Sequence, residues 1–221
     1  MRGGLSDVAA ADRPLIAERG WSRDLGAYVV DIAWLGGQVA FALGDGTIRI
    51  ITGDVLSGGA VPAIEAHRGA ILSLALHPDG GSLLTGGDDG RLVRTPPDGQ
   101  CETVLDFGRF WVEHIETHSE TGIIACGVGK DVHVLLKDEA KINHTLTHPS
   151  SAGGVRLDAK GRRLAVSHYG GVSVWWTLLP DAPKKELAWR GSHLALNWSP
   201  DGRFLVTAMQ ENALHGWRVG D

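Results

Sequence analysis

A segment of about 41 residues recurs five times along this 221-residue chain. Each copy holds an alternating apolar run, a turn, a second apolar run, a second turn and a third alternating run. The clearest copy extends from Ala66 to Thr95, and the last extends from Trp189 to Val219. Repeats of roughly 40 to 45 residues with several strands in each are typical of a β-propeller. The repeat therefore predicts the architecture and says little about the activity.

Turn residues mark the same two places in every copy. The first turns fall at Gly36-Gly37, Asp79-Gly80, Thr121-Gly122, Lys160-Gly161 and Asp201-Gly202. The second turns fall at Asp45-Gly46, Asp89-Gly90, Gly129-Lys130, Tyr169-Gly170 and Glu211-Asn212. Glycine, asparagine and aspartate suit these places because two-residue hairpin turns need positive φ angles. The turns therefore predict hairpins that connect the first three strands of each copy.

The runs between the turns have the period of a strand. Leu72, Leu74 and Leu76 point to one side, while Ser73 and Ala75 point to the other. A weaker fourth run follows the third in the first four copies. Four short antiparallel strands make one propeller blade. We predict a single all-β domain over residues 1–221, with blades at 28–66, 70–108, 111–147, 153–190 and 194–219.

The sequence leaves two alternatives for the number of blades in the ring. Residues 14–20 resemble residues 62–69, which belong to a predicted fourth strand, and the last copy has only three strands. A closing strand at 13–20 would complete a five-bladed ring, and closure removes sheet edges that invite pairing with other chains. The alternative is that these five blades are part of a seven-bladed ring.

Charge and hydropathy limit the classes of partner. The net charge is −5 and the pI is about 6.0, whereas a general nucleic-acid binder carries a basic excess. No apolar run approaches the roughly 18 residues of a membrane span. The first twenty residues lack the apolar core of a signal peptide. The sequence predicts a soluble cytoplasmic protein with no nucleic-acid or membrane partner.

The repeat resembles the WD-repeat (Trp-Asp) family of propellers over nearly the whole chain. That family places a histidine before the first strand, Ser or Thr in the second strand, Asp in the second turn and Trp after the third strand. The matching residues here are His67, Thr85 and Asp89 in copy two, His148, Ser167 and Trp175 in copy four, and Thr207 and Trp217 in copy five. The resemblance implies that these side chains form a hydrogen-bonded series that holds the outer part of each blade. No copy has the Trp-Asp pair, so the repeats are degenerate and of a bacterial type.

No catalytic, cofactor-binding or metal-binding group stands out in the sequence. The glycine-rich segments at 43–47 and 85–90 are hairpin turns between strands, so neither offers a helix N-terminus to a phosphate. The pairs His114/His118 and His144/His148 are four residues apart. On a strand that spacing covers roughly 13 Å, too far for two imidazoles to share one zinc ion. We therefore predict no enzyme, no cofactor and no metal.

Binding of another protein is the favoured function. In propellers, the loops that lead into the first strands share one face, the top face, with the second turns. Arg68, Arg109 and Arg190 hold the same position of these loops, and Trp111 and Trp189 lie beside two of them. Arginine and tryptophan are enriched at interface hot spots. We predict that they bind an acidic segment of a partner protein, unless each arginine instead pairs with a carboxylate of a neighbouring blade.

Two further points stay open in the sequence. The alternative function is a hydrolase or lyase in the central channel, with candidate residues on the first strands: Asp31, Glu113, His114 and Asn197. The second point concerns Arg94, which stands where other copies have core-facing residues. A buried arginine needs a carboxylate partner. Alternatively, the strand slips by one residue and Val93 points inward.

Overall fold

The computed structural model describes residues 22–52, 60–179 and 181–220. All regular structure in these residues is β-strand. The described part of the chain therefore has no helix that is long and apolar enough to cross a membrane. The predicted all-β class is confirmed. The predicted closing strand at 13–20 lies outside the described residues.

Three four-stranded antiparallel sheets form the first three blades. Blade one contains β1 (Val29–Leu35), β2 (Gln38–Leu43), β3 (Thr47–Ile51) and β4 (Ile64–Glu65). Blade two contains β5 (Ile71–Leu76), β6 (Leu83–Gly87), β7 (Arg91–Thr95) and β8 (Glu102–Asp106). Blade three contains β9 (His114–His118), β10 (Ile123–Val128), β11 (Asp131–Leu136) and β12 (His144–Thr147).

Blades four and five share one sheet. It contains β13 (Gly154–Leu157), β14 (Arg163–Trp176), β15 (Lys185–Trp198), β16 (Phe204–Met209) and β17 (Ala213–Arg218). β14 bends back on itself at Gly170 and Gly171, whose φ angles are 97° and 146°. As a result, the Thr177 N–H donates to the Arg162 carbonyl oxygen at 2.9 Å. β14 thus supplies the second and third strands of blade four.

β15 replaces the predicted break between blades four and five. Its first half pairs with β14 through Lys185–Ala188, and its second half pairs with β16 through His193–Trp198. Ser192 still pairs with Tyr169, so the ladder continues where a loop was expected. One strand therefore forms the outer edge of blade four and the inner strand of blade five.

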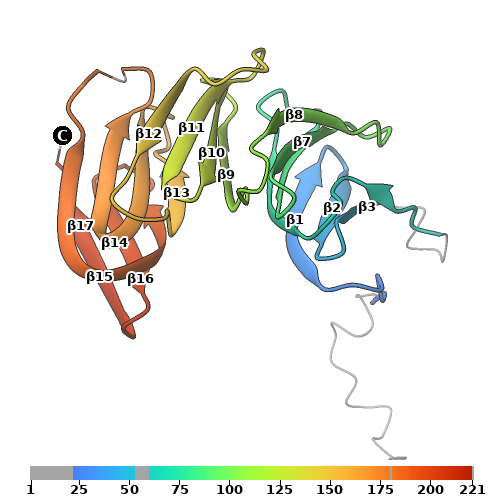
Figure 1. Cartoon of the computed structure of the whole chain (residues 1–221), viewed down its shortest axis with the longest axis horizontal. Coiled ribbons are helices and arrows are strands. Elements are labelled where there is room, and N and C mark those ends of the chain that lie inside the picture. Colours follow the sequence, from blue (N-terminus) through green and yellow to red (C-terminus); the bar gives the residue numbers. More distant parts are fainter. Residues whose placement is uncertain (1–21, 53–59, 180, 221) are drawn as a thin grey trace, which may run out of the picture.

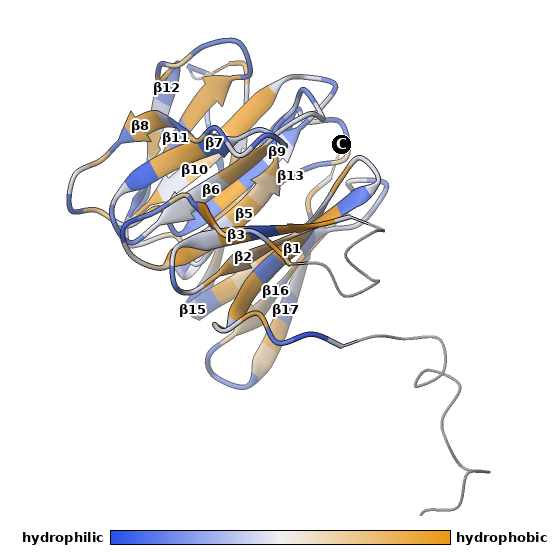
Figure 2. Ribbon diagram, turned by 90° about the vertical axis from the view of Figure 1, so that its right-hand side faces the viewer, coloured by the Kyte–Doolittle hydropathy of each residue, from blue (hydrophilic) through white to orange (hydrophobic). Residues whose placement is uncertain are grey.

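The blades follow one another in chain order along an arc, from β1–β3 at one end to β15–β17 at the other (Figure 1). The first strands are neighbours in the order β1, β5, β9, β13 and β15. Apolar residues run along the strands, and many of the loops are hydrophilic (Figure 2). The arrangement is that of propeller blades around a common centre.

Apolar side chains fill each interface between successive blades. Between blades three and four, for example, Ile123 and Val134 pack with Val155 and Leu164, all nearly inaccessible to solvent. Full burial of such an aliphatic side chain contributes about 1.5–3 kcal/mol. Contact between neighbouring blades therefore stabilises the arc.

Arg94 does not face the core. Its side chain is 38% exposed and pairs with Asp79, while its Nε donates to the Ser82 hydroxyl at 2.8 Å. Val93, by contrast, is 1% exposed and belongs to the core between blades one and two. Of the two alternatives, a buried Arg94 is excluded, and Val93 takes the inward position.

Candidate partner-binding face

The loops that join successive blades lie against the second turns. The Val112 N–H donates to the Gly87 carbonyl at 3.1 Å, and the Ala152 N–H donates to the Gly129 carbonyl at 2.8 Å. Within blade five, the Gln210 N–H of the second turn donates to the Ser192 carbonyl at 3.0 Å, as the Asp88 N–H does to the Ala70 carbonyl in blade two. We call these joining loops and second turns the top face, and the backbone bonds fix its shape.

Three arginines of the top face have exposed side chains. Two of them lie in joining loops, as predicted, whereas Arg190 lies within β15, because a continuous strand replaces the loop expected there. Arg68, Arg109 and Arg190 all extend into solvent. Within residues 22–52, 60–179 and 181–220, no carboxylate forms an ion pair with any of their guanidinium groups. Lys130, in the second turn of blade three, is equally exposed and unpaired there. The pairing with neighbouring blades that we considered as an alternative is absent from this part of the structure.

Carboxylates near these loops are bound to backbone groups instead. Asp89 accepts the Arg68 N–H at 3.0 Å, and Glu211 accepts the Ser192 N–H at 2.9 Å. Asp106 accepts the Gly108 N–H at 2.7 Å. These acids hold the joining loops in place, which leaves the guanidinium groups free for another anion.

Exposed aromatic rings accompany the arginines. Trp111 is 55% exposed and Trp189 is 51% exposed. The Trp189 ring stacks on His215 with 3.9 Å between the ring centroids, so one face of the indole ring is packed against another side chain. A supported ring loses little conformational entropy when a partner binds.

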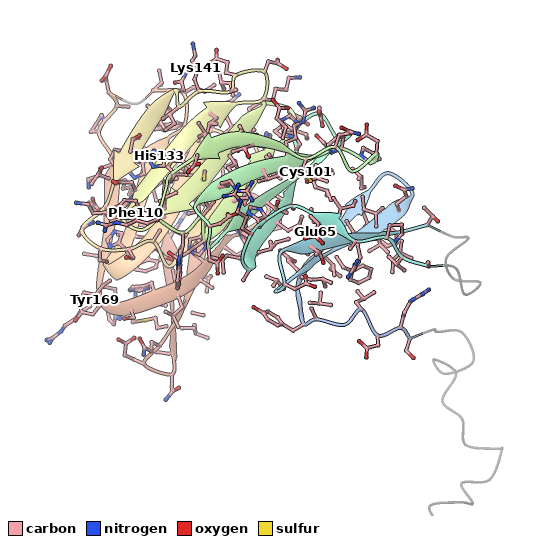
Figure 3. The ribbon with its side chains drawn as sticks, turned by 45° about the vertical axis from the view of Figure 1, so that its right-hand side comes forward. Glu65, Cys101, Phe110, His133, Lys141 and Tyr169 are labelled. Atoms are coloured by element: carbon pink, nitrogen blue, oxygen red, sulfur yellow. The ribbon has the colours of Figure 1, made fainter. Side chains whose placement is uncertain are left out.

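Two aromatic residues of the top face were missed by the sequence argument. Phe110 is 57% exposed, and the guanidinium carbon of Arg109 lies 5.5 Å from its ring centroid. Tyr169, in the second turn of blade four, is 56% exposed. Both residues lie toward the left of the molecule in Figure 3. Phe110 adjoins Trp111 in the sequence, and that adjacency was a usable signal.

In blade two, hydrogen bonds join all three residues predicted for the series, although Thr95 stands at the position of the family's tryptophan. The His67 Nδ1–H donates to Asp89 at 2.8 Å, and the Thr85 hydroxyl donates to His67 Nε2 at 2.9 Å. Burial lowers the pKa of His67 below its usual range, against the opposing effect of Asp89. Hydrogen bonds from His67 and from the backbone and side chain of neighbouring arginines lower the pKa of Asp89, despite the opposing cost of its burial. The series connects the joining loop to the second turn.

Blade four contains only part of the series. The Trp175 indole N–H donates to His148 Nε2 at 3.0 Å, and His148 Nδ1 bonds to the Lys130 carbonyl at 3.0 Å. Burial lowers the pKa of His148 to about 4. Ser167, which the family pattern placed in this network, is buried with no hydrogen-bond partner for its hydroxyl. Its inclusion was wrong, because Trp175 and Lys130 use both nitrogens of His148.

Blade five has a histidine that the sequence argument missed. His193 is 1% exposed, its Nδ1 lies 2.8 Å from the Thr207 hydroxyl, and its Nε2 lies 2.9 Å from the Trp189 carbonyl. Trp217 lies beside it, with ring centroids 5.6 Å apart. His193 in blade five, like His67 in blade two, is a buried histidine that bonds to the threonine of the second strand. It was overlooked because it is shifted toward the first strand from the family position.

The channel candidates are only partly together. Asp31, Glu113 and His114 line one cavity of about 320 Å³, but Asn197 is not among its lining residues. His114 Nε2 bonds to the Ala152 carbonyl at 3.1 Å, and burial lowers the pKa of this imidazole. Glu116 and Arg156, which form an ion pair at 3.0 Å, also line the cavity. Among the described residues, no three His, Cys, Asp or Glu side chains are placed to hold a metal ion.

One blade matches a known family of repeats. Residues 59–93, which include β4, β5, β6 and the start of β7, match the family described as "WD domain, G-beta repeat". The chain contains a WD repeat. The hydrogen-bonded residues His67, Thr85 and Asp89 of blade two all lie within this matched segment, and the other blades repeat its strand order.

A solved structure shares the fold of these blades. A chain of the "Crystal Structure of Mitotic Checkpoint Complex" superposes with a TM-score of 0.67 at 20% identity. The match covers 87% of this chain and 64% of that chain. This chain therefore corresponds to less than two thirds of the length of the solved one. None of the curated proteins matches the sequence.

Proposed function

We propose that this chain is a non-catalytic protein-interaction scaffold whose top face binds an acidic segment of a partner protein. One observation carries the proposal: Arg68, Arg109 and Arg190 are exposed at equivalent places without a carboxylate partner in the described structure. The WD repeat and the propeller fold support a scaffold role in general terms. The acidic nature of the partner follows from the charge of the three side chains.

The aromatic rings define the second requirement on the partner. Trp111 and Trp189 offer apolar surface beside Arg109 and Arg190. Clusters of Trp and Arg carry most of the binding energy in many interfaces. We infer that the bound segment combines Asp or Glu residues with at least one large apolar side chain.

The test uses fluorescent 15-residue peptides rich in Glu and Asp, each with one Leu or Trp. Fluorescence anisotropy measures their binding to the wild type and to the triple variant Arg68→Glu, Arg109→Glu, Arg190→Glu. We expect binding that weakens with added salt and is lost in the triple variant, with the same melting temperature. A matched control, Lys141→Glu, Lys160→Glu, Arg162→Glu, makes the same change of net charge at exposed positions away from the joining loops.

Equal binding by the triple variant and the wild type would contradict the proposal. So would equal loss in the control variant, because net charge alone would then explain the effect. The channel alternative is tested on the same samples by elemental analysis and by turnover on a panel of hydrolase substrates. Turnover that His114→Gln abolishes would favour that alternative over the scaffold.

A further inference from the structure

A cavity of about 310 Å³ lies between blades two and three, apart from the top face and from the channel candidates. Blade two contributes residues of β6, β7 and β8 together with His77, which follows β5. Blade three contributes Ile124 of β10 and the loop after β11, which contains Lys141, labelled at the upper edge of Figure 3. A volume of about 300 Å³ or more is typical of a small-molecule site.

The cavity has apolar walls. Leu84 and Ile124 are buried in the core between blades two and three, and Val104 packs against that core. All three side chains line the cavity. Ligand pockets combine such apolar walls with a few polar groups that fix the orientation of the ligand. This part of the cavity therefore suits an alkyl chain.

His77 supplies a buried N–H donor. Its side chain is only 5% exposed, and the Asp79 N–H donates to its Nδ1 at 3.2 Å. The proton of the neutral ring therefore lies on Nε2. In a charged ring, which Asp79 Oδ1 at 3.0 Å from Nδ1 would attract, both nitrogens carry protons. In either form Nε2–H donates, and no described residue accepts its hydrogen bond.

Lys137 supplies a cation at the exposed rim of the same cavity. Its ammonium group has no ion-pair partner in the part of the chain that the structure describes. Arg94 also lines the cavity, but its guanidinium group is bound to Asp79 and to the Ser82 hydroxyl. Lys137 and His77 are therefore the groups that remain available to a ligand carboxylate.

Carboxylates of the rim supply the opposite charge. Glu102 and Asp138 line the cavity, and neither forms an ion pair or accepts a hydrogen bond within residues 22–52, 60–179 and 181–220. Glu139 beside them lies 3.6 Å from Lys141, and its Oε2 is buried without a hydrogen bond. The rim therefore has unused acceptors for an ammonium group.

We propose that this cavity binds a free aliphatic α-amino acid. An amine alone would leave Lys137 and the Nε2–H of His77 unmatched, and a carboxylate alone would leave Glu102 and Asp138 unmatched. A zwitterion satisfies both sets, with its carboxylate on Lys137 and His77 and its ammonium group on Glu102 and Asp138. Its alkyl chain lies against the apolar walls. This site is independent of the function proposed for the top face.

The test compares three probes by isothermal titration calorimetry on the 221-residue chain. Leucine carries both charges, 4-methylpentanoate lacks the ammonium group, and isoamylamine lacks the carboxylate. We expect saturable binding of leucine and at least about tenfold weaker binding of either analogue, because each leaves charged groups of the rim without a partner.

Variants of the lining residues assign the binding to this cavity. Lys137→Met and Glu102→Gln change exposed side chains, so each should keep the melting temperature and weaken leucine binding at least about tenfold. His77→Asn keeps an acceptor near the position of Nδ1 and removes Nε2–H, and it should also weaken binding. Lys160→Met is the matched control, because Lys160 is an exposed lysine that does not line this cavity. It should bind leucine like the wild type.

Four results would overturn the proposal. The first is no saturable heat with leucine at about 10 mM. The second is equal binding of leucine and isoamylamine, which would indicate a site for cations, and the third is equal binding of leucine and 4-methylpentanoate, which would indicate a site for anions. The fourth is leucine binding that Lys137→Met and Glu102→Gln leave unchanged, which would place the ligand elsewhere.

Discussion

Blades three and five use similar amino acids in their second strands, but solvent reaches them differently. All six residues of β10 are buried, whereas three of the six in β16 are exposed. The difference does not come from the strands, since both are mostly apolar on both faces. It comes from their neighbours, because blade three lies between two blades and blade five has a blade on one side only. Burial in this fold is therefore a property of position in the arc.

The largest expected effect contrasts the two faces of blade five. Leu205 is fully buried against blade four, and Leu214 is 78% exposed on the face of blade five that points away from blade four. We expect Leu205→Ala to lower the free energy of unfolding by about 2–5 kcal/mol, because it leaves a cavity. Leu214→Ala should change it by less than about 0.5 kcal/mol. Urea unfolding measures both changes, and equal losses would mean that the face carrying Leu214 is also covered.

The next effect contrasts blade two with blade four. Thr85→Val keeps the shape of the side chain but removes the hydrogen bond to buried His67, at a cost of about 1–3 kcal/mol. Ser167→Ala removes a buried hydroxyl that has no partner, so stability should stay the same or rise slightly. The contrast fails if Ser167→Ala costs as much as Thr85→Val in thermal or urea unfolding.

A pH effect follows from His148 of blade four. Its pKa is about 4 in the folded protein and about 6.5 in the unfolded chain, so the unfolded state binds more protons between these values. Stability is therefore complete above pH 6.5 and falls as the pH drops toward 4. From pH 7 to pH 5 we expect a loss of about 1–2 kcal/mol from this residue.

His148→Gln supplies the comparison for the pH effect. Urea unfolding of the wild type and the variant at both pH values isolates the contribution of His148 from that of the other buried histidines. The variant should lose less stability than the wild type on acidification. An identical pH dependence of the two proteins would show that His148 keeps an ordinary pKa in the fold.

The repeat period was enough to predict the blades, because the turns and the period-2 runs are local features. The period did not decide whether Val93 or Arg94 is buried, because alternation cannot say which of two adjacent residues faces the core. It also missed His193, since the family position lies earlier in the chain than this side chain. The partner of Arg94, Asp79, comes from the first turn of the same blade and has no signature in the sequence.

The exposure of the end blades could not be predicted from composition. β16 and β10 have the same apolar character, so the sequence of either strand indicates burial on both faces. Only the order of the blades in space shows which faces lack a neighbour. The arginines of the top face could be selected from the sequence, because Arg68, Arg109 and Arg190 recur at one position of the repeat. Their lack of carboxylate partners could be seen only in the structure.

The most direct test that position in the arc decides burial is the reactivity of a cysteine on the exposed face of blade five, where Val206 lies. Val206→Cys and Val134→Cys are compared in a Cys101→Ser background, where Cys126 remains buried and its thiol pKa is raised to about 12. Val134 is fully buried in blade three. We predict that a maleimide labels the cysteine at 206 at least about 100-fold faster than that at 134, because the latter reacts only after local unfolding. Equally slow labelling of both would contradict the account, since blade five would then be as well covered as blade three.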